Sequence, residues 1–512
     1  MIMDNSVNNK RIAKNTLLLY FRTLFVMLVA LYTSRVVLGT LGVTDYGIYN
    51  VVGGVVAMFG FLNSAMTTAT QRYITFSLGK GDEAQVQTVF STALQIHVLI
   101  SALVVILCET VGLWFMYEKM QIPADRINAA FWVFQCSIAS TVIVILSVPY
   151  NAAIVAHEQM SAFAYISIVE VVLKLLVVYL IKIVDYDRLI FYAILILSVQ
   201  LIARILYGRY CSCHFKETKF RRVWNKTMFR EMLSFAGWNL WGNCASVAFT
   251  QGVNILLNMF FGPVVNAARG IAVQVQAAVA QFSANFQTAI NPQITKSYAV
   301  QNYAHMHSLI YSSSKFTFYL LLLVSLPIIL ETNYILHLWL GTYPDCTGAF
   351  VRLILCITII DSMTNPLGVA VSATGKVKVY QGVLGGVLLS ILPVSYIFLK
   401  LGGNPVTVFV VHLNIVVIAF LIRLLIIRPL IRLSLYDYGK RVVLPCVSVA
   451  VASLILLVTM KKLLMLGGTA AFFAVCLSSA FCVPVIAYEF GLSVSERAFI
   501  RGKLSDILQK LK

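Results

Sequence analysis

Two arginines lie in long apolar stretches, and neither has an acidic residue three or four positions away. They are Arg22, in the stretch 15–38, and Arg269, in the stretch 265–291. A guanidinium at membrane depth is costly, and its planar fork of N–H donors matches two phosphate oxygens. Both arginines are therefore predicted to bind an anionic, phosphate-bearing substrate.

Three other charged residues also lie in apolar stretches, and the role of each can be interpreted in more than one way. Glu170 and Lys174 are one helical turn apart with the glutamate first, the order that favours an ion pair. Asp361 precedes Asn365-Pro366, where a helix could break, so it could be a hydrogen-bonded cap. Each of the three could instead serve a coupling ion, H⁺ or Na⁺. The two arginines could also snorkel, or pair with Glu170 or Asp361 across a helix interface.

Uncharged polar residues recur at helical spacing in two of the apolar stretches. Amide side chains can hydrogen-bond sugars without a fixed charge, so we predict that they line a wet cavity and contact the substrate. The alternative is that they hydrogen-bond neighbouring helices within the lipid. The predicted substrate-binding residues are Asn239, Asn243 and Asn254 in the stretch 234–260, and Gln274, Gln281 and Asn285 in the stretch 265–291.

The elements that must position these side chains are membrane-spanning helices. The chain is 60% hydrophobic and only 12% charged, whereas a soluble domain carries about 25% charged residues. A span needs roughly 20 apolar residues, and about fourteen stretches qualify. The sequence therefore predicts an all-α polytopic membrane protein. The predicted spans are 15–38, 46–70, 88–114, 127–148, 160–182, 189–208, 234–260, 265–291, 309–330, 347–368, 379–400, 405–427, 442–460 and 468–489.

The chain also repeats itself after about 220 residues. Residues 42–75 align with 262–295, and residues 149–156 align with 366–373. Membrane proteins made of two like halves are usually transporters, with the substrate site between the halves.

The repeat predicts three parts. Residues 1–220 and 221–432 are each expected to form a six-helix lobe, and 433–512 two additional helices and a cytoplasmic tail. Six spans return the chain to its starting side, so the two repeats are predicted to be parallel. Lysines and arginines fall mostly on the side of both termini, which makes that side cytoplasmic.

The net charge of +19 is explained by this topology. The basic segment 209–230 is interpreted as a cytoplasmic anchor that faces anionic membrane lipids. The alternative is a nucleic-acid-binding arm, and we expect no nucleic acid partner.

No sequence motif for catalysis or for metal binding is recognisable. The sequence holds no P-loop, zincin helix or nucleophile elbow. Cys211, Cys213 and His214 lie close together but no second ligand pair follows at metal-site spacing. The chain is therefore not expected to be an enzyme or to hold a metal.

Three segments resemble a known family. Residues 41–74 (LGVTDYGIYNVVGGVVAMFGFLNSAMTTATQRYI), 148–163 (VPYNAAIVAHEQMSAF) and 268–299 (ARGIAVQVQAAVAQFSANFQTAINPQITKSYA) look like the bacterial polysaccharide flippases. These O-antigen and capsule repeat-unit translocases belong to the multidrug/oligosaccharidyl-lipid/polysaccharide (MOP) exporter superfamily. In the related lipid II flippases, arginines of the cavity hold the diphosphate, a pattern that Arg22 and Arg269 fit.

The resemblance implies a substrate and a location. The substrate would be an undecaprenyl-diphosphate-linked oligosaccharide, moved from the cytoplasmic to the periplasmic leaflet of the bacterial inner membrane by alternating access between two lobes. Polysaccharide polymerase and chain-length proteins would be partners, and H⁺ or Na⁺ could be a coupling ion, with no other cofactor. The alternatives are a cation-coupled multidrug antiporter of the same fold and a membrane-embedded polysaccharide polymerase or ligase.

Overall fold

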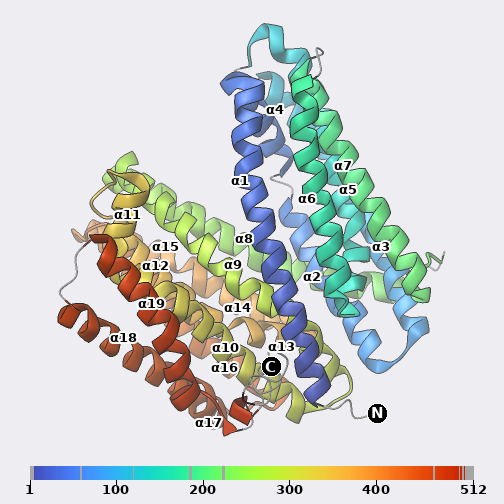
Figure 1. Ribbon diagram of the computed structural model, residues 1–512. Coiled ribbons are helices and arrows are strands. Elements are labelled where there is room, and N and C mark those ends of the chain that lie inside the picture. Colours follow the sequence, from blue (N-terminus) through green and yellow to red (C-terminus); the bar gives the residue numbers. More distant parts are fainter. Residues whose placement is uncertain are drawn as a thin grey trace, which may run out of the picture. The chain divides into compact units, whose positions relative to one another are not determined.

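A computed structural model describes residues 5–57, 60–118, 120, 122–183, 187–221, 225–464, 468–494, 496–498 and 501. Across these residues the regular structure consists of helices, with no strand (Figure 1). Ten helices or runs of helices there are long and apolar enough to cross a membrane. The predicted fold class, an all-α polytopic membrane protein, is confirmed.

The described residues of the first half form seven α-helices. A π-helical turn, Cys108–Gly112, joins α3 to α4. A short 3₁₀ turn, Ala124–Arg126, precedes α5, and another, Lys216–Thr218, follows α7. The α-helices are α1 (Asn5–Ala57), α2 (Gly60–Lys80), α3 (Glu83–Leu107), α4 (Leu113–Glu118), α5 (Ile127–Ala156), α6 (Met160–Ile183) and α7 (Arg188–His214).

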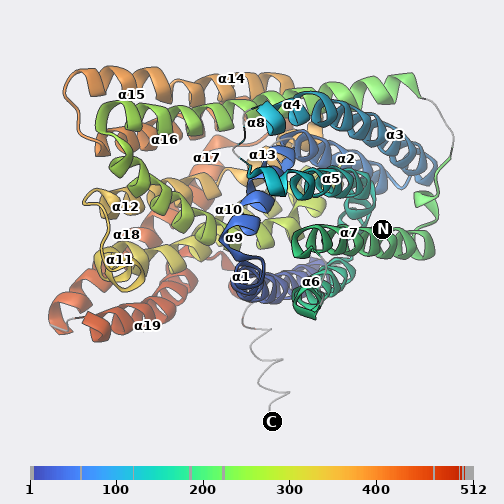
Figure 2. The ribbon, with the colours of Figure 1, turned by 90° about the horizontal axis from the view of Figure 1, so that it is seen from above.

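In the second half the helices are divided into more and shorter pieces than in the first. The helices of the segment predicted to lie beyond the two repeats come last in the chain. Within it, α14 and α15 follow one another along α16 (Figure 2). The helices are α8 (Lys226–Phe261), α9 (Pro263–Ala299), α10 (Tyr303–Leu330), α11 (Thr332–Leu340), α12 (Thr347–Ser362), α13 (Asn365–Thr374), α14 (Val377–Leu389), α15 (Ile391–Lys400), α16 (Val406–Ile431), α17 (Leu435–Tyr438), α18 (Leu444–Leu464) and α19 (Gly468–Ile486), with π-helical turns at Gly439–Val443 and Ala487–Gly491.

Contacts divide the chain into two units. One is Arg11–Asn243, and the other is Cys244–Lys512 together with Met1–Lys10. In the first unit, α5 packs against α2, α3 and α7. In the second, α12 packs against α9, α10 and α16, which follow in the same chain order. The predicted lobe limits at residues 220 and 432 stay a prediction.

The backbone repeats in detail at two glycines that lie 220 residues apart. Gly42 has φ 80° and ψ 169°, and it interrupts α1. Gly262 has φ 78° and ψ −173°, and it precedes α9, whose first residue is Pro263. Only glycine adopts this combination of angles readily. The same rare conformation in the two aligned segments confirms the internal repeat.

Two further pairs of left-handed residues keep the same spacing. Gly81 (φ 74°) follows α2 and Gln301 (φ 58°) follows α9, again 220 residues apart. Glu158 (φ 61°) follows α5 and Gly375 (φ 76°) follows α13, at the 217-residue offset of the second aligned segment. The repeat therefore extends to the turns that end corresponding helices.

A buried ion pair attaches the segment after α19 to α10. The Lys315 ammonium lies 2.5 Å from a Glu496 carboxylate oxygen, and the two side chains are 5% and 13% exposed. Ser312 donates a hydrogen bond to the other carboxylate oxygen (2.7 Å). Tyr319 donates one to the Gly491 carbonyl (3.3 Å). The last two long helices are thus fixed to the second unit by charge as well as by apolar packing.

We expect Gly42→Ala and Gly262→Ala to destabilise the protein by about 1–3 kcal/mol each, because a Cβ strains this backbone conformation. No atom lies within 4 Å of the added Cβ at either site, so the cost comes from the backbone alone. Gly39→Ala, within helical backbone and with equally open space, is the matched control and should not destabilise. Thermal melting of the purified protein in detergent measures the effect, and equal melting of all three variants would contradict it.

Glu496→Gln should destabilise the protein by about 3–5 kcal/mol at neutral pH, because it leaves the Lys315 ammonium buried without a counter-charge. Burial raises the pKa of Glu496, but the Lys315 charge and the hydrogen bonds from Lys315, Ser493 and Ser312 outweigh it and hold the pKa below its ordinary value. The stabilisation is therefore complete above about pH 4.3 and is lost as the pH falls through the lowered pKa.

Melting curves from pH 7 downward test this pH dependence, since wild type and Glu496→Gln should converge in acid. The control is Glu489→Gln in the same segment, whose partner Arg497 lies 3.7 Å away in an exposed pair. That exposed pair should contribute about 0–1 kcal/mol. A constant difference between Glu496→Gln and wild type at every pH would refute the role of the ion pair.

Candidate functional site

Arg22 lies in the first unit, on α1, with an aromatic ring instead of an acid against its guanidinium. The guanidinium carbon is 4.7 Å from the centre of the Phe163 ring, on α6. The Arg22 Nε atom is buried and has no hydrogen-bond partner in the described part of the chain. Tyr207 and Glu170 are close enough to act on Arg22 electrostatically. The arginine thus retains hydrogen-bonding capacity at membrane depth.

Glu170 is occupied by a neighbour on its own helix. The Lys174 ammonium lies 2.6 Å from the Glu170 carboxylate, the i, i+4 ion pair that the spacing indicated. Gln200, on α7, donates a second hydrogen bond to the same oxygen (3.3 Å). A coupling ion that binds Glu170 would therefore have to break the existing ion pair with Lys174.

Arg269 lies in the second unit, on α9, and is only 7% exposed. Its Nη1 donates to the Asn254 side-chain oxygen, and its Nη2 donates to the Thr250 carbonyl (3.0 Å). The Asn254 amide also donates to Gln251 (3.0 Å). Asn254, which we expected to contact sugar, thus positions the arginine. Both groups that accept hydrogen bonds from Arg269 are uncharged.

Asp361 is paired with an arginine that lies inside the predicted span 405–427. Arg423, on α16, approaches the Asp361 carboxylate to 2.8 Å and is 14% exposed. Thr364 also donates to that carboxylate (3.1 Å), in the turn where α12 ends and α13 begins at Asn365. Arg423 stands alone among apolar residues of α16, and this signal could have placed it inside the membrane.

The polar stripe on α8 bonds to helices. Asn239 is 6% exposed and donates to the Phe235 carbonyl of its own helix (2.8 Å). Asn243 donates to Ser64 on α2 (3.1 Å). The Asn243 contact matches the alternative that the stripe hydrogen-bonds neighbouring helices, whereas Asn239 bonds to its own helix.

The residues predicted on α9 fall on two faces. Gln274 and Gln281 are exposed, whereas Asn285 is 5% exposed. Two other glutamines join α9 to its neighbours: Gln276 donates to Thr358 (3.0 Å), and Gln287 accepts from Asn365 (3.0 Å). Gln274 and Gln281 are therefore the amides on this helix that are open to contact a substrate.

The structure draws attention to one acid that the sequence analysis passed over. Glu109 lies within the span Glu83–Glu118, in the π-helical turn that joins α3 to α4. It accepts a hydrogen bond from the uncharged Gln135 (3.3 Å). π-Helical turns often mark functional positions. Glu109 is thus a candidate for binding a coupling ion.

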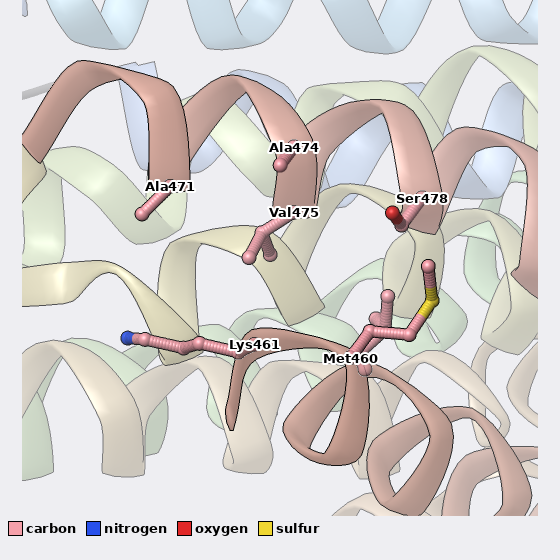
Figure 3. Close-up of a pocket in the computed structure, with 7 residues that line it drawn as sticks. Met460, Lys461, Ala471, Ala474, Val475 and Ser478 are labelled. Atoms are coloured by element: carbon pink, nitrogen blue, oxygen red, sulfur yellow. The ribbon is translucent and has the colours of Figure 1, made fainter. Parts of the chain in front are cut away.

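A shallow, open pocket lies apart from these residues, between α18 and α19 (Figure 3). Alanine, valine, leucine and methionine side chains form most of its wall. The Lys461 ammonium points away from the pocket (Figure 3) and pairs with Glu331 at 2.8 Å. None of the predicted site residues lines it. The lining residues are Leu457, Met460, Lys461, Ala471, Ala474, Val475 and Ser478.

Comparison with known proteins gives a likeness in structure. No family model matches the sequence, and no curated protein matches it. A crystal structure of a MATE mutant superposes with a TM-score of 0.72 at 12% identity, over 83% of this chain and 97% of that chain. The chain has the fold of the MATE proteins.

Two further structures with the MATE fold agree. An outward-facing multidrug resistance MATE family transporter of the MOP superfamily gives a TM-score of 0.69 at 15% identity, over 83% of this chain and 96% of that chain. A MOP superfamily transporter from Pyrococcus furiosus gives 0.68, with the same identity and coverage. About a sixth of this chain lies outside the MATE fold, close in size to the predicted additional part 433–512.

Cysteine labelling distinguishes open amides from buried ones. In a background without the native cysteines, Gln274→Cys and Gln281→Cys should react with a membrane-impermeant maleimide, whereas Asn239→Cys and Asn285→Cys should not. Ile255→Cys on α8, whose isoleucine is 65% exposed, controls for exposure to lipid and should be unreactive in the membrane. Unreactive cysteines at both 274 and 281 would contradict a wet surface on α9.

Proposed function

We propose that the chain is a membrane transporter for an anionic lipid-linked substrate, an undecaprenyl-diphosphate-linked oligosaccharide. It would move this substrate from the cytoplasmic to the periplasmic leaflet by alternating access of its two halves. The MATE fold supports a transporter of the MOP type over a membrane-embedded polymerase or ligase, since the named neighbours with this fold are transporters.

The balance of charges at membrane depth carries the choice of an anionic substrate. Glu170 and Asp361 are each neutralised by a base, at 2.6 and 2.8 Å. In the described part of the chain, the guanidinium of Arg269 bonds to uncharged oxygens and that of Arg22 lies against an aromatic ring. Among the described residues neither Arg22 nor Arg269 thus has an ion pair, and there is one of them in each half. A diphosphate offers the oxygens that both can bind.

The MATE fold alone is equally compatible with a cation-coupled multidrug antiporter. A cationic substrate would need an acid that is free to receive it, and Glu109, bonded to Gln135, is the observation that favours this second candidate. One neighbour with this fold is described as having a binding pocket of reverse polarity that suggests a different function. Polarity is therefore the property on which the two candidates divide.

The remaining parts of the proposal follow from the sequence. The protein would lie in the bacterial inner membrane with both termini cytoplasmic, and polysaccharide polymerase and chain-length proteins would be its partners. A coupling H⁺ or Na⁺ would bind at Glu109, or at Glu170 or Asp361 if their ion pairs open.

Arg22→Ala and Arg269→Ala should each slow translocation of the lipid-linked oligosaccharide about ten- to a hundredfold. Each removes charge-assisted hydrogen bonds of about 1.5–3 kcal/mol. Asn254→Asp should slow it as much as Arg269→Ala, because the new carboxylate would neutralise the guanidinium in place. Arg269→Lys should retain only part of the activity, because lysine keeps the positive charge but lacks the bidentate fork of the guanidinium. Translocation is measured in proteoliposomes that contain undecaprenyl-diphosphate oligosaccharide.

The matched control is Arg352→Ala. Arg352, on α12, also bonds to uncharged acceptors, the Ile329 carbonyl (3.3 Å) and the Asn333 side chain (3.2 Å), and it lies outside the proposed site. Wild-type rates in Arg22→Ala and Arg269→Ala would refute the diphosphate role. Transport of a lipophilic cation that is lost in Glu109→Gln but retained in both arginine variants would favour the antiporter.

A further inference from the structure

The segment after α7, Phe215–Arg221, is fixed to the first unit instead of hanging free. The His157 ring, in the turn between α5 and α6, stacks on the Phe215 ring at 4.0 Å with an interplanar angle of 7°. The same His157 ring places its Nε2 2.6 Å from the Glu217 carboxylate.

Two hydrogen bonds with α3 hold the other end of this segment. Gln87 donates to the Lys219 carbonyl (3.2 Å), and the Arg221 backbone N–H donates to Ser91 (3.1 Å). Thr218, which directly precedes Lys219, is buried. The segment therefore has a defined inner face and a defined outer face.

This attachment sorts the charges of the segment. Glu217, its only acid, is turned inward toward His157, and its side chain is 12% exposed. Lys216, Lys219 and Arg221 are all exposed. Phe220 stands among them with 53% of its surface exposed. The outward face of the segment itself thus carries three basic side chains and one aromatic ring.

We infer that this face binds anionic lipid headgroups of the cytoplasmic leaflet, with Phe220 inserted at the level of the headgroups. The segment begins one residue after the span Arg188–His214 ends, so it lies at the membrane boundary. Clustered basic residues there attract anionic lipids, and aromatic rings favour the interface. A folded nucleic acid would not explain an exposed phenylalanine beside a membrane span.

The proposed lipid-binding segment also connects the two repeats, because it leads from α7 to α8. Lipid bound there would hold this connection against the leaflet. His157 and Glu217 act as positioning residues, because they turn the carboxylate away from the lipid. Other charged or titratable groups around them are Glu158 in the same turn, Lys216 beside Glu217, and Arg204, Cys211, Tyr210 and His214 on α7.

The first experiment places an environment-sensitive fluorophore on Phe220→Cys in a background without native cysteines. In nanodiscs, emission should shift to shorter wavelength when phosphatidylglycerol is added to phosphatidylcholine, and high salt should reverse the shift. Neutralising Lys216, Lys219 and Arg221 to glutamine should raise the phosphatidylglycerol content needed for the half-maximal shift by about fivefold for each charge removed. Lys80→Gln, an exposed lysine elsewhere in the first unit, should leave it unchanged.

Identical emission with and without phosphatidylglycerol would overturn the proposal. So would a shift produced by RNA in pure phosphatidylcholine nanodiscs, or one displaced by inorganic phosphate. Glu217→Gln tests the positioning role: it removes a negative charge but releases the attachment, so the shift should weaken. A stronger shift in Glu217→Gln would show charge attraction alone and refute the positioning.

A second measurement needs no label and no cysteine-free background. The wild-type chain and the triple glutamine variant are purified from the same membranes, and the bound phosphatidylglycerol is quantified by mass spectrometry. The variant should retain several-fold less of this lipid and the same amount of phosphatidylethanolamine. Equal retention of phosphatidylglycerol would overturn the proposal.

Discussion

A charged side chain inside a membrane must find a counter-charge or a set of dipoles, since water is not there to solvate it. This requirement accounts for most polar contacts in the chain. Glu170 has Lys174, and Asp361 has Arg423. Arg269 is solvated by an amide oxygen and a backbone carbonyl. The Arg22 guanidinium lies against an aromatic ring and would gain charge-assisted hydrogen bonds from an anionic ligand.

The same absence of water made much of the fold predictable. A backbone in lipid must satisfy its own hydrogen bonds, so apolar stretches of span length become helices. The described parts of the predicted spans lie in helices or runs of helices. The break at Asn365-Pro366 was predicted because proline cannot continue a helix, and α12 ends at Ser362 while α13 begins at Asn365. The π-helical turn at Cys108–Gly112 was not predictable, because no residue type there forces it.

The site was predictable only in part, for a related reason. Composition reveals which charges lie deep in apolar sequence, and this singled out Arg22 and Arg269. It does not reveal which side chain on another helix will pair with them. Arg423 lies inside the predicted span 405–427, but only the packing of α16 against α12 shows that it reaches Asp361. Asn254 likewise could not be assigned to Arg269 from spacing alone.

The two halves share a backbone but differ in chemistry. The turns at Gly42 and Gly262 have the same dihedral angles, since few residues tolerate that conformation and a change there strains the chain. Side chains at other positions are less constrained. In α3 the buried His97 bonds to its own helix (2.7 Å), whereas α10 carries Lys315 paired with Glu496 (2.5 Å). A repeated fold therefore fixes where two like helices lie, and the side chains decide what each half can bind.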